Sequence, residues 1–313
     1  MATISRGGPV VRRPWLTPKR REAFYGYLFA APFIIGFLAL TVGPMIFSLY
    51  TSFTKYNIVS APRWIGLANY ADILTYDEDF RTALRNTLFY VAIKTPLVVA
   101  LSLGMAMLLN VRGLPWMRFF RTVFYLPTVL TGVAAVFLWV WILNPDGLLN
   151  NALGLLGLPR PNWFYDPAWS KPGLIVMSLW YLGSPMLIFL AGLNNIPVQL
   201  YEAGAIDGAR GFRRFWYITV PLLSPTIFYI VVTNVIGAFQ IFTAAYIVSN
   251  TAGAKLGDPS QSLLFYEVYL YDRAFGKLQL GYASALAWIL FAIVMVITLL
   301  QLWLARRWVH YEE

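Results

Sequence analysis

The sequence contains no cysteine, a single histidine and few charged residues. The absence of cysteine excludes disulfide bonds and thiolate metal sites, and His310 alone does not supply the ligand set of a zinc site. Charged residues make up 12% of the 313 positions and hydrophobic residues 59%, whereas a soluble domain has about 25% charged residues. These shares exclude an ordinary water-soluble domain and indicate a chain that folds in a membrane.

Long apolar runs predict membrane-spanning helices, because a helix needs about 20 apolar residues to cross the hydrocarbon core of a bilayer. The sequence predicts six of them and hence an all-α membrane protein. Their ranges are Ala23–Thr54, Thr87–Leu109, Thr122–Leu143, Gly173–Ile196, Leu222–Val248 and Gly281–Trp303. We expect kinks at prolines within or near these segments. The prolines are Pro32, Pro44, Pro96, Pro127, Pro185 and Pro225.

Basic residues are distributed unevenly between the two sides of this predicted bundle. The segments 1–22, 110–121, 197–221 and 304–313 hold 14 basic and 5 acidic residues, and the segments 55–86, 144–172 and 249–280 hold 9 of each. The positive-inside rule therefore predicts that both chain termini are cytoplasmic. The chain divides into a basic cytoplasmic segment 1–22, a transmembrane domain 23–303 and a cytoplasmic tail 304–313. No basic soluble domain remains to bind nucleic acid.

The second cytoplasmic loop, residues 197–221, is rich in charge and longer than a plain connector between helices. Pro197 suits the first turn of a helix, and Asp207-Gly208 predicts a break in that helix. The stretch ARGFRRFWYITV then resumes a helical pattern before Pro221. Two interpretations follow. The loop is either a solvated connector whose arginines serve only topology, or a projecting helical hairpin whose small residues let a partner approach closely.

The loop also resembles a known motif. Glu202-Ala203-Gly204, Gly208 and Ile218-Thr219-Val220-Pro221 resemble the EAA loop of bacterial ABC-importer permeases, whose pattern is E-A-A, three residues, G, nine residues and I-x-L-P. Gly204 and Val220 are the two departures from that pattern. The stretches WIGLANY, ALRNTLFY, RTVFYLPTV, NPDGLLN and GYASALAWILF resemble segments of maltose-type and glycerol-phosphate-type sugar permeases. The resemblance covers the chain except for its N-terminal segment.

The resemblance implies the type I ABC importer permease fold in a bacterial inner membrane, and binding-protein-dependent import of a sugar. It implies that residues 197–221 contain a coupling helix, in which Glu202 contacts an ATPase and Gly208 permits the turn. The residues that it assigns to coupling are Glu202, Ala203, Gly204, Asp207, Gly208, Ile218 and Pro221. The partners that it implies are a second permease subunit of different sequence, two cytoplasmic ABC ATPase subunits, an extracytoplasmic sugar-binding protein and membrane lipid.

The chain contains no G-x-x-x-x-G-K-[ST] motif for holding ATP. We therefore expect no cofactor in this chain, with ATP and magnesium bound by the partner ATPase. The chain is then a transport subunit, and it lacks the nucleophile–base or metal constellation of a membrane enzyme. A self-contained secondary transporter is the alternative function. It would need an intramembrane carboxylate as an ion site, and the six predicted spans contain neither Asp nor Glu.

Polar and small residues within the spans are candidates for the sugar path. In the fifth span a stripe headed by Asn234 resembles the stripe by which sugar permeases contact their substrate in mid-membrane. In the fourth span the stretch WYLGSP combines a kink with small residues. Close helix packing is the alternative interpretation, because it also favours Gly and Ser. The candidates are Asn234, Gly237, Ala238, Ile241 and the neighbouring Gln240, together with Trp180, Gly183 and Ser184.

Lys94 is the one charged residue inside the six predicted spans, about 10 Å along the helix from Asn86. Its amine either snorkels outward to the membrane interface, faces a vestibule, or pairs with the partner permease. An anionic substrate is an extension of the vestibule interpretation.

Overall fold

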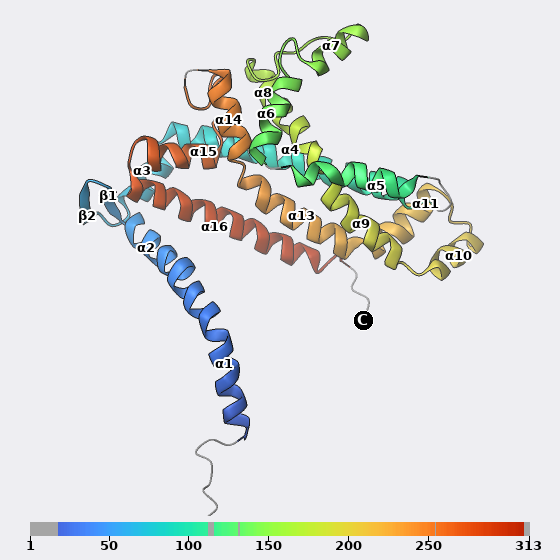
Figure 1. Ribbon diagram of the computed structural model, residues 1–313, viewed down its shortest axis with the longest axis horizontal. Helices are drawn as coiled ribbons and strands as arrows, with labels where there is room; N and C mark the ends of the chain where they lie inside the picture. The colour runs from blue at the N-terminus through green and yellow to red at the C-terminus, as the bar shows by residue number, and fades with distance from the viewer. Residues whose placement is uncertain (1–17, 112–115, 131, 254, 310–313) are drawn as a thin grey trace, which may run out of the picture.

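The computed structural model describes residues 18–111, 116–130, 132–253 and 255–309. His310 and most of the predicted cytoplasmic segment 1–22 lie outside these residues. The described chain is mostly helical, as the sequence predicts, with one two-stranded hairpin (Figure 1). In chain order its elements are α1 (Pro18–Phe37), η1 (Leu38–Val42), α2 (Gly43–Ser52), β1 (Thr54–Asn57), β2 (Ser60–Trp64), α3 (Ala68–Thr75), α4 (Glu78–Leu109), α5 (Met117–Tyr125), η2 (Leu126–Val129), α6 (Gly132–Ile142), α7 (Leu148–Leu155), α8 (Pro167–Ser178), η3 (Leu179–Tyr181), α9 (Gly183–Asn195), α10 (Val198–Ile206), α11 (Phe212–Arg214), η4 (Phe215–Thr219), α12 (Val220–Leu222), α13 (Ser224–Phe239), α14 (Thr243–Ala252), α15 (Tyr266–Tyr271), η5 (Asp272–Gly276) and α16 (Leu280–Ala305).

Three helices in the described residues are long and apolar enough to cross a membrane: Glu22–Ser52, α4 and α16. Three further spans are each formed by a pair of helices with a bend between them. If each bent pair counts as one span, the total is six. Two of these pairs are Pro167–Tyr181 with α9, bent by 50°, and Phe212–Leu222 with α13, bent by 70°. The third pair is Phe119–Val129 with α6. The described fold therefore agrees with a six-span bundle, but half of the spans are broken.

The prediction of one continuous helix for the fifth span, Leu222–Val248, is wrong. Helix α13 ends at Phe239, and α14 starts only at Thr243. The ring of Phe242 stacks on Tyr246 at 5.2 Å between centroids and meets Tyr271 of α15 at 5.1 Å. These aromatic contacts hold α14 on the bundle, so packing rather than a local helix breaker ends α13.

The hairpin β1–β2 was not predicted by the sequence pattern, which ran the first span to Thr54. The helix ends at Ser52. Thr54 then begins β1 and lies opposite Trp64 in the antiparallel pairing with β2. The side-chain amide of Asn69 donates to the carbonyl oxygens of Ser52 and Thr54, at 2.8 and 3.0 Å. These bonds satisfy the carbonyls where the helix ends, so the chain can turn into the hairpin.

The buried core lies between α4 and the helices packed around it. α4 packs against α9, α13 and α15, and α16 packs against α2. One hydrophobic cluster joins α4, α13, α15 and α16, and a second joins the other end of α4 with α9 and α13. The hairpin and α3 lie at one end of the bundle and α10 at the other (Figure 1). The two ends therefore present separate candidate sites, joined by α4 and α13.

Candidate functional site

The loop 197–221 projects as a short helix, a turn and a returning helical segment. Helix α10 lies at the extremity of the bundle opposite the hairpin (Figure 1). The chain returns through α11, η4 and α12 into α13. The predicted shape of this loop is therefore confirmed, with the break at Asp207-Gly208, and its role as a docking surface stays a prediction.

The turn after α10 is a Schellman motif with Gly208 in the left-handed region. Its φ is +78°, a conformation that glycine adopts without steric cost. The backbone N–H of Ala209 donates to the carbonyl of Gly204 at 2.7 Å, and that of Gly208 donates to Ala205 at 3.2 Å. This pair of bonds satisfies the last carbonyls of the helix and reverses the chain sharply. Gly208 is thus needed for the shape of the loop.

The two halves of the EAA-like pattern touch each other. Gly204 is buried, and a Cβ atom there would lie 2.3 Å from Cδ1 of Ile218. The hydroxyls of Tyr201 and Thr219 are hydrogen-bonded at 3.2 Å, and the guanidinium of Arg214 lies 5.6 Å from the centre of the Tyr201 ring. α10 and the returning segment therefore pack as one body, and the glycine at 204 gives room to the isoleucine methyl.

The outward surface of this loop carries both large apolar side chains and charged side chains. Ile206, Phe212 and Tyr217 are 87%, 76% and 77% exposed. Glu202, Ala203 and Asp207 are also exposed, whereas Pro221 is half-buried where the chain re-enters the bundle. Such a concentration of exposed large apolar side chains on a projecting loop is typical of a protein-binding surface. Between the loop and the ends of α4 and α9 lies an open groove of about 510 Å³, lined in part by Asn110, Tyr201 and Arg214.

The structure brings together two residues that the sequence analysis treated separately. Nζ of Lys94 on α4 lies 3.4 Å from Oδ1 of Asn234 on α13, so the lysine amine bonds inside the bundle rather than snorkelling outward. The amide nitrogen of Asn234 donates to the carbonyl of Ile230 at 3.0 Å. Gly237 is exposed, and a Cβ atom there would meet nothing within 4 Å. The Asn234 face of α13 therefore borders open space.

The other path candidates lie in different surroundings. Ala238 is buried, and Gln240 and Ile241 fall in the break after α13, so the predicted stripe ends before Ile241. Gly183 is buried against α5, where a Cβ atom would lie 2.2 Å from the carbonyl oxygen of Phe124. This contact favours the close-packing interpretation for Gly183, and Ser184 beside it is exposed. The roles of all these residues in a sugar path stay predictions.

Trp180 forms an aromatic pair that the sequence did not reveal. Its ring meets that of Trp139 edge to face, with 5.5 Å between centroids. Within the described residues, the buried Nε1 atoms of both rings lack a hydrogen-bond partner. Because Trp139 and Trp180 lie far apart in the sequence, and many aromatics occur in the spans, no local signal distinguishes this pair.

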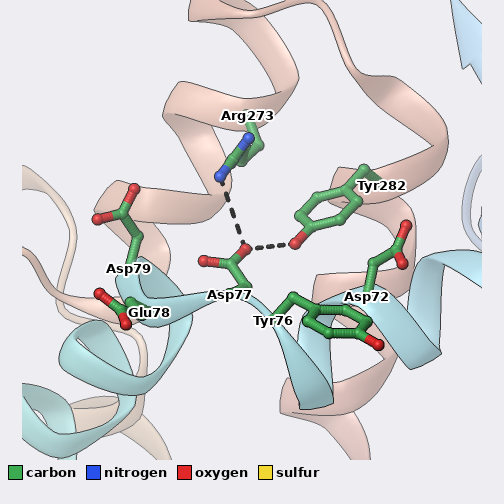
Figure 2. Close-up of a pocket in the computed structure, with 7 residues that line it drawn as sticks. All are labelled: Asp72, Tyr76, Asp77, Glu78, Asp79, Arg273 and Tyr282. Carbon is green, nitrogen blue, oxygen red and sulfur yellow. Dashed lines mark hydrogen bonds and ion pairs between the residues drawn. The ribbon is translucent and has the colours of Figure 1, made fainter.

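A second site missed by the sequence analysis lies at the hairpin end of the bundle. An open pocket of about 460 Å³ is bordered by four carboxylates and one guanidinium (Figure 2). Its lining residues are Asp72, Tyr76, Asp77, Glu78, Asp79, Arg273 and Tyr282. In Figure 2, Arg273 and Tyr282 both point toward Asp77 from a different part of the chain.

Asp77 joins three segments that are distant in sequence. Its carboxylate accepts the Phe80 N–H at 2.9 Å and so caps α4, and it also accepts the hydroxyls of Tyr269 and Tyr282. Arg273 lies 3.6 Å from the same carboxylate. Burial acts to raise the pKa of Asp77, but the hydroxyl and N–H donors and the Arg273 charge outweigh it and hold the pKa below its usual value. The described residues contain no group of His, Cys, Asp and Glu side chains that could hold a metal ion.

The described residues therefore form a helical membrane chain with broken spans and one projecting loop, an architecture that suits a transport subunit. The chain belongs to the family described as the binding-protein-dependent transport system inner membrane component, whose model matches residues 97–310. Proteins of this family are ABC transporter permeases, which are transport components without a catalytic site, and the ATPase is a separate subunit.

Known relatives agree with this family. The chain is 43% identical over 296 residues to the probable ABC transporter permease YesP of Bacillus subtilis strain 168, covering 94% of both proteins. It is 32% identical to the lactose transport permease LacF of Rhizobium radiobacter, covering 98% of this chain and 99% of the relative. One chain in the crystal structure of a bacterial alginate ABC transporter, in complex with an alginate pentasaccharide-bound periplasmic protein, superposes with a TM-score of 0.79. That chain is 25% identical, and the match covers 92% of this chain and 96% of the other.

Proposed function

We propose that this chain is a permease subunit of an ATP-driven, binding-protein-dependent sugar importer, and that it forms half of the translocation path. The observation that carries the proposal is the loop 197–221, whose EAA-like residues fold into one projecting body with an exposed apolar surface. The similarity to a lactose permease and to a permease of an alginate transporter supports a carbohydrate substrate.

The partners follow from this role. The exposed surface around Glu202 and Ile206 docks into a cytoplasmic ABC ATPase, one of two such subunits, and that subunit binds ATP and magnesium. A second permease of different sequence completes the path. It also covers part of the helix from Glu22 to Ser52, of which the most apolar window has no buried residue. A sugar-binding protein docks on the opposite, hairpin end of the bundle.

The orientation in the membrane is testable because the natural chain has no cysteine. With both termini and Arg210–Arg214 in the cytoplasm, a single cysteine introduced as Ser260→Cys is expected to react with a membrane-impermeant thiol reagent in intact cells. Ser5→Cys is expected to react only after the cells are opened. Labelling of Ser5→Cys alone in intact cells would reverse the assigned topology.

ATP-dependent sugar uptake by the complex in proteoliposomes tests the path, and Asn234→Ala is the informative variant. The amide borders open space and holds the Lys94 amine, so its loss is expected to lower uptake about tenfold and to change the preference among related sugars. Assembly and basal ATP hydrolysis are expected to stay near the wild-type level. Exposed Thr233 on the adjacent face of α13 provides a control as Thr233→Ala. Loss of assembly with unchanged sugar preference would make Asn234 a packing residue instead.

A further inference from the structure

Lys94 lies deep in the apolar part of the bundle. It is the seventeenth residue of the 32-residue helix α4, about 24 Å from the start of that helix. Thr87, Val91 and Val98 lie one or two turns away on the same side of α4, and all three are buried. The Lys94 side chain is half-buried and reaches α13 through Asn234. Its amine thus faces the interior of the bundle rather than lipid.

The charge of Lys94 has no counterion among the described residues. The ion pairs found there are Arg273–Asp77 and Lys277–Asp272, both at the hairpin end. Within the described part of the chain, the Lys94 amine has one hydrogen-bond partner, the neutral amide oxygen of Asn234 at 3.4 Å. An ammonium group within a membrane is costly, and intramembrane charges usually pair or line a pathway. A long hydrogen bond to one amide leaves most of this cost uncompensated.

The face of α13 that carries Asn234 is open one turn further along the helix. Gly237 lies one turn beyond Asn234 on α13, and a Cβ atom at that position would meet nothing within 4 Å. The amide nitrogen of Asn234 is held by its own helix, so its oxygen is directed to Lys94. The result is a positioned cation next to an open face, with two of its three N–H donors unassigned.

We propose that Lys94 is the binding site for a carboxylate on the transported molecule, so that the substrate is an acidic sugar of the uronate class. The proposal rests on the function proposed above, and it adds the substrate's charge to it. A carboxylate that reaches the face of Gly237 accepts hydrogen bonds from the Lys94 amine and neutralises it in a medium of low dielectric constant. Asn234 acts as a positioning residue for the amine.

The test uses the assembled complex in proteoliposomes with its binding protein. One probe is a mixture of uronate-containing oligosaccharides, and the other is the same mixture after chemical reduction of its carboxylates to neutral sugars. Mass spectrometry of the vesicle lumen identifies what enters. The wild type is expected to import acidic species in preference to their reduced counterparts. Lys94→Met is expected to lower acidic uptake at least tenfold while changing neutral uptake less than twofold, and Lys94→Arg to retain the preference.

Lys55→Met, at an exposed position of the hairpin, is the matched loss of a lysine charge and is expected to keep wild-type uptake of both mixtures. Preferred import of the reduced mixture by the wild type would overturn the proposal while leaving the sugar permease intact. Equal loss of both uptakes in Lys94→Met, or loss of assembly, would also overturn it, because Lys94 would then be structural or paired with the partner permease. Uptake of neither mixture by an assembled, ATP-hydrolysing complex would also overturn the uronate proposal, whereas the sugar permease function would fall only if other sugars also failed to enter.

Discussion

Gly208→Pro is expected to abolish ATP-dependent uptake while the transmembrane bundle stays folded. Gly208 has a φ of +78°, whereas proline is fixed near −65°, and proline also lacks the N–H that Gly208 donates to Ala205. The Schellman turn would open, and α10 would lose its fixed position against Ile218. We expect uptake to fall by about a hundredfold or more, because the coupling between the ATPase and the path depends on that position.

Glu202→Lys tests the same coupling without altering the shape of the loop. Glu202 is exposed, so the substitution is expected to leave the thermal unfolding temperature unchanged. The reversed charge at the docking surface is nevertheless expected to remove sugar-stimulated ATP hydrolysis and uptake.

Gly157→Pro is the control for Gly208→Pro, because Gly157 also has a positive φ of +71° but lies far from the loop. Normal uptake in both loop variants would show that residues 197–221 do not couple the two subunits.

Asp77→Ala is expected to cause the largest loss of stability of any single substitution proposed for this chain. The change removes the cap of α4, worth about 1 kcal/mol, and leaves the hydroxyls of Tyr269 and Tyr282 without an acceptor. The orphaned hydroxyl of buried Tyr269 costs about 1–3 kcal/mol, whereas half-buried Tyr282 lines the open pocket and can bond to water, so a total loss of about 2–4 kcal/mol follows. Thermal unfolding of the detergent-solubilised protein measures this loss. Asp72→Asn, an exposed carboxylate on the rim of the same pocket, is expected to be neutral.

The Asp77 contribution is also expected to depend on pH. The folded protein holds the pKa of this carboxyl below its value in the unfolded chain, which is about 3.9. Unfolding therefore takes up a proton at acid pH. The stabilisation is complete above the pKa of the unfolded chain, and it is lost as the pH falls through the lower pKa of the folded protein. The stability difference between the wild type and Asp77→Asn should shrink below about pH 4. A difference that stays constant between pH 3 and pH 7 would contradict an ionised Asp77.

The features that the sequence predicted are those that local chemistry determines. The break at Asp207-Gly208 follows from the conformational freedom of glycine, and α4 and α16 follow from their long apolar runs. The end of α13 at Phe239 was not predictable, because it depends on the packing of Phe242 against Tyr271 of a later helix. The bond between Lys94 and Asn234 joins residues 140 positions apart, and Asp77 meets partners that are further away still. Contacts of this range leave no local signal in a single sequence.

The contact between Gly204 and Ile218 defines the smallest unit of the loop that can be exchanged with another permease. Because the isoleucine methyl occupies the space where a side chain at position 204 would begin, neither position is independent of the other. A graft of α10 alone would import a foreign surface onto the native returning segment and create either a clash or a void at this contact. A chimera designed to bind a different ATPase subunit must therefore carry the whole segment from Pro197 to Pro221.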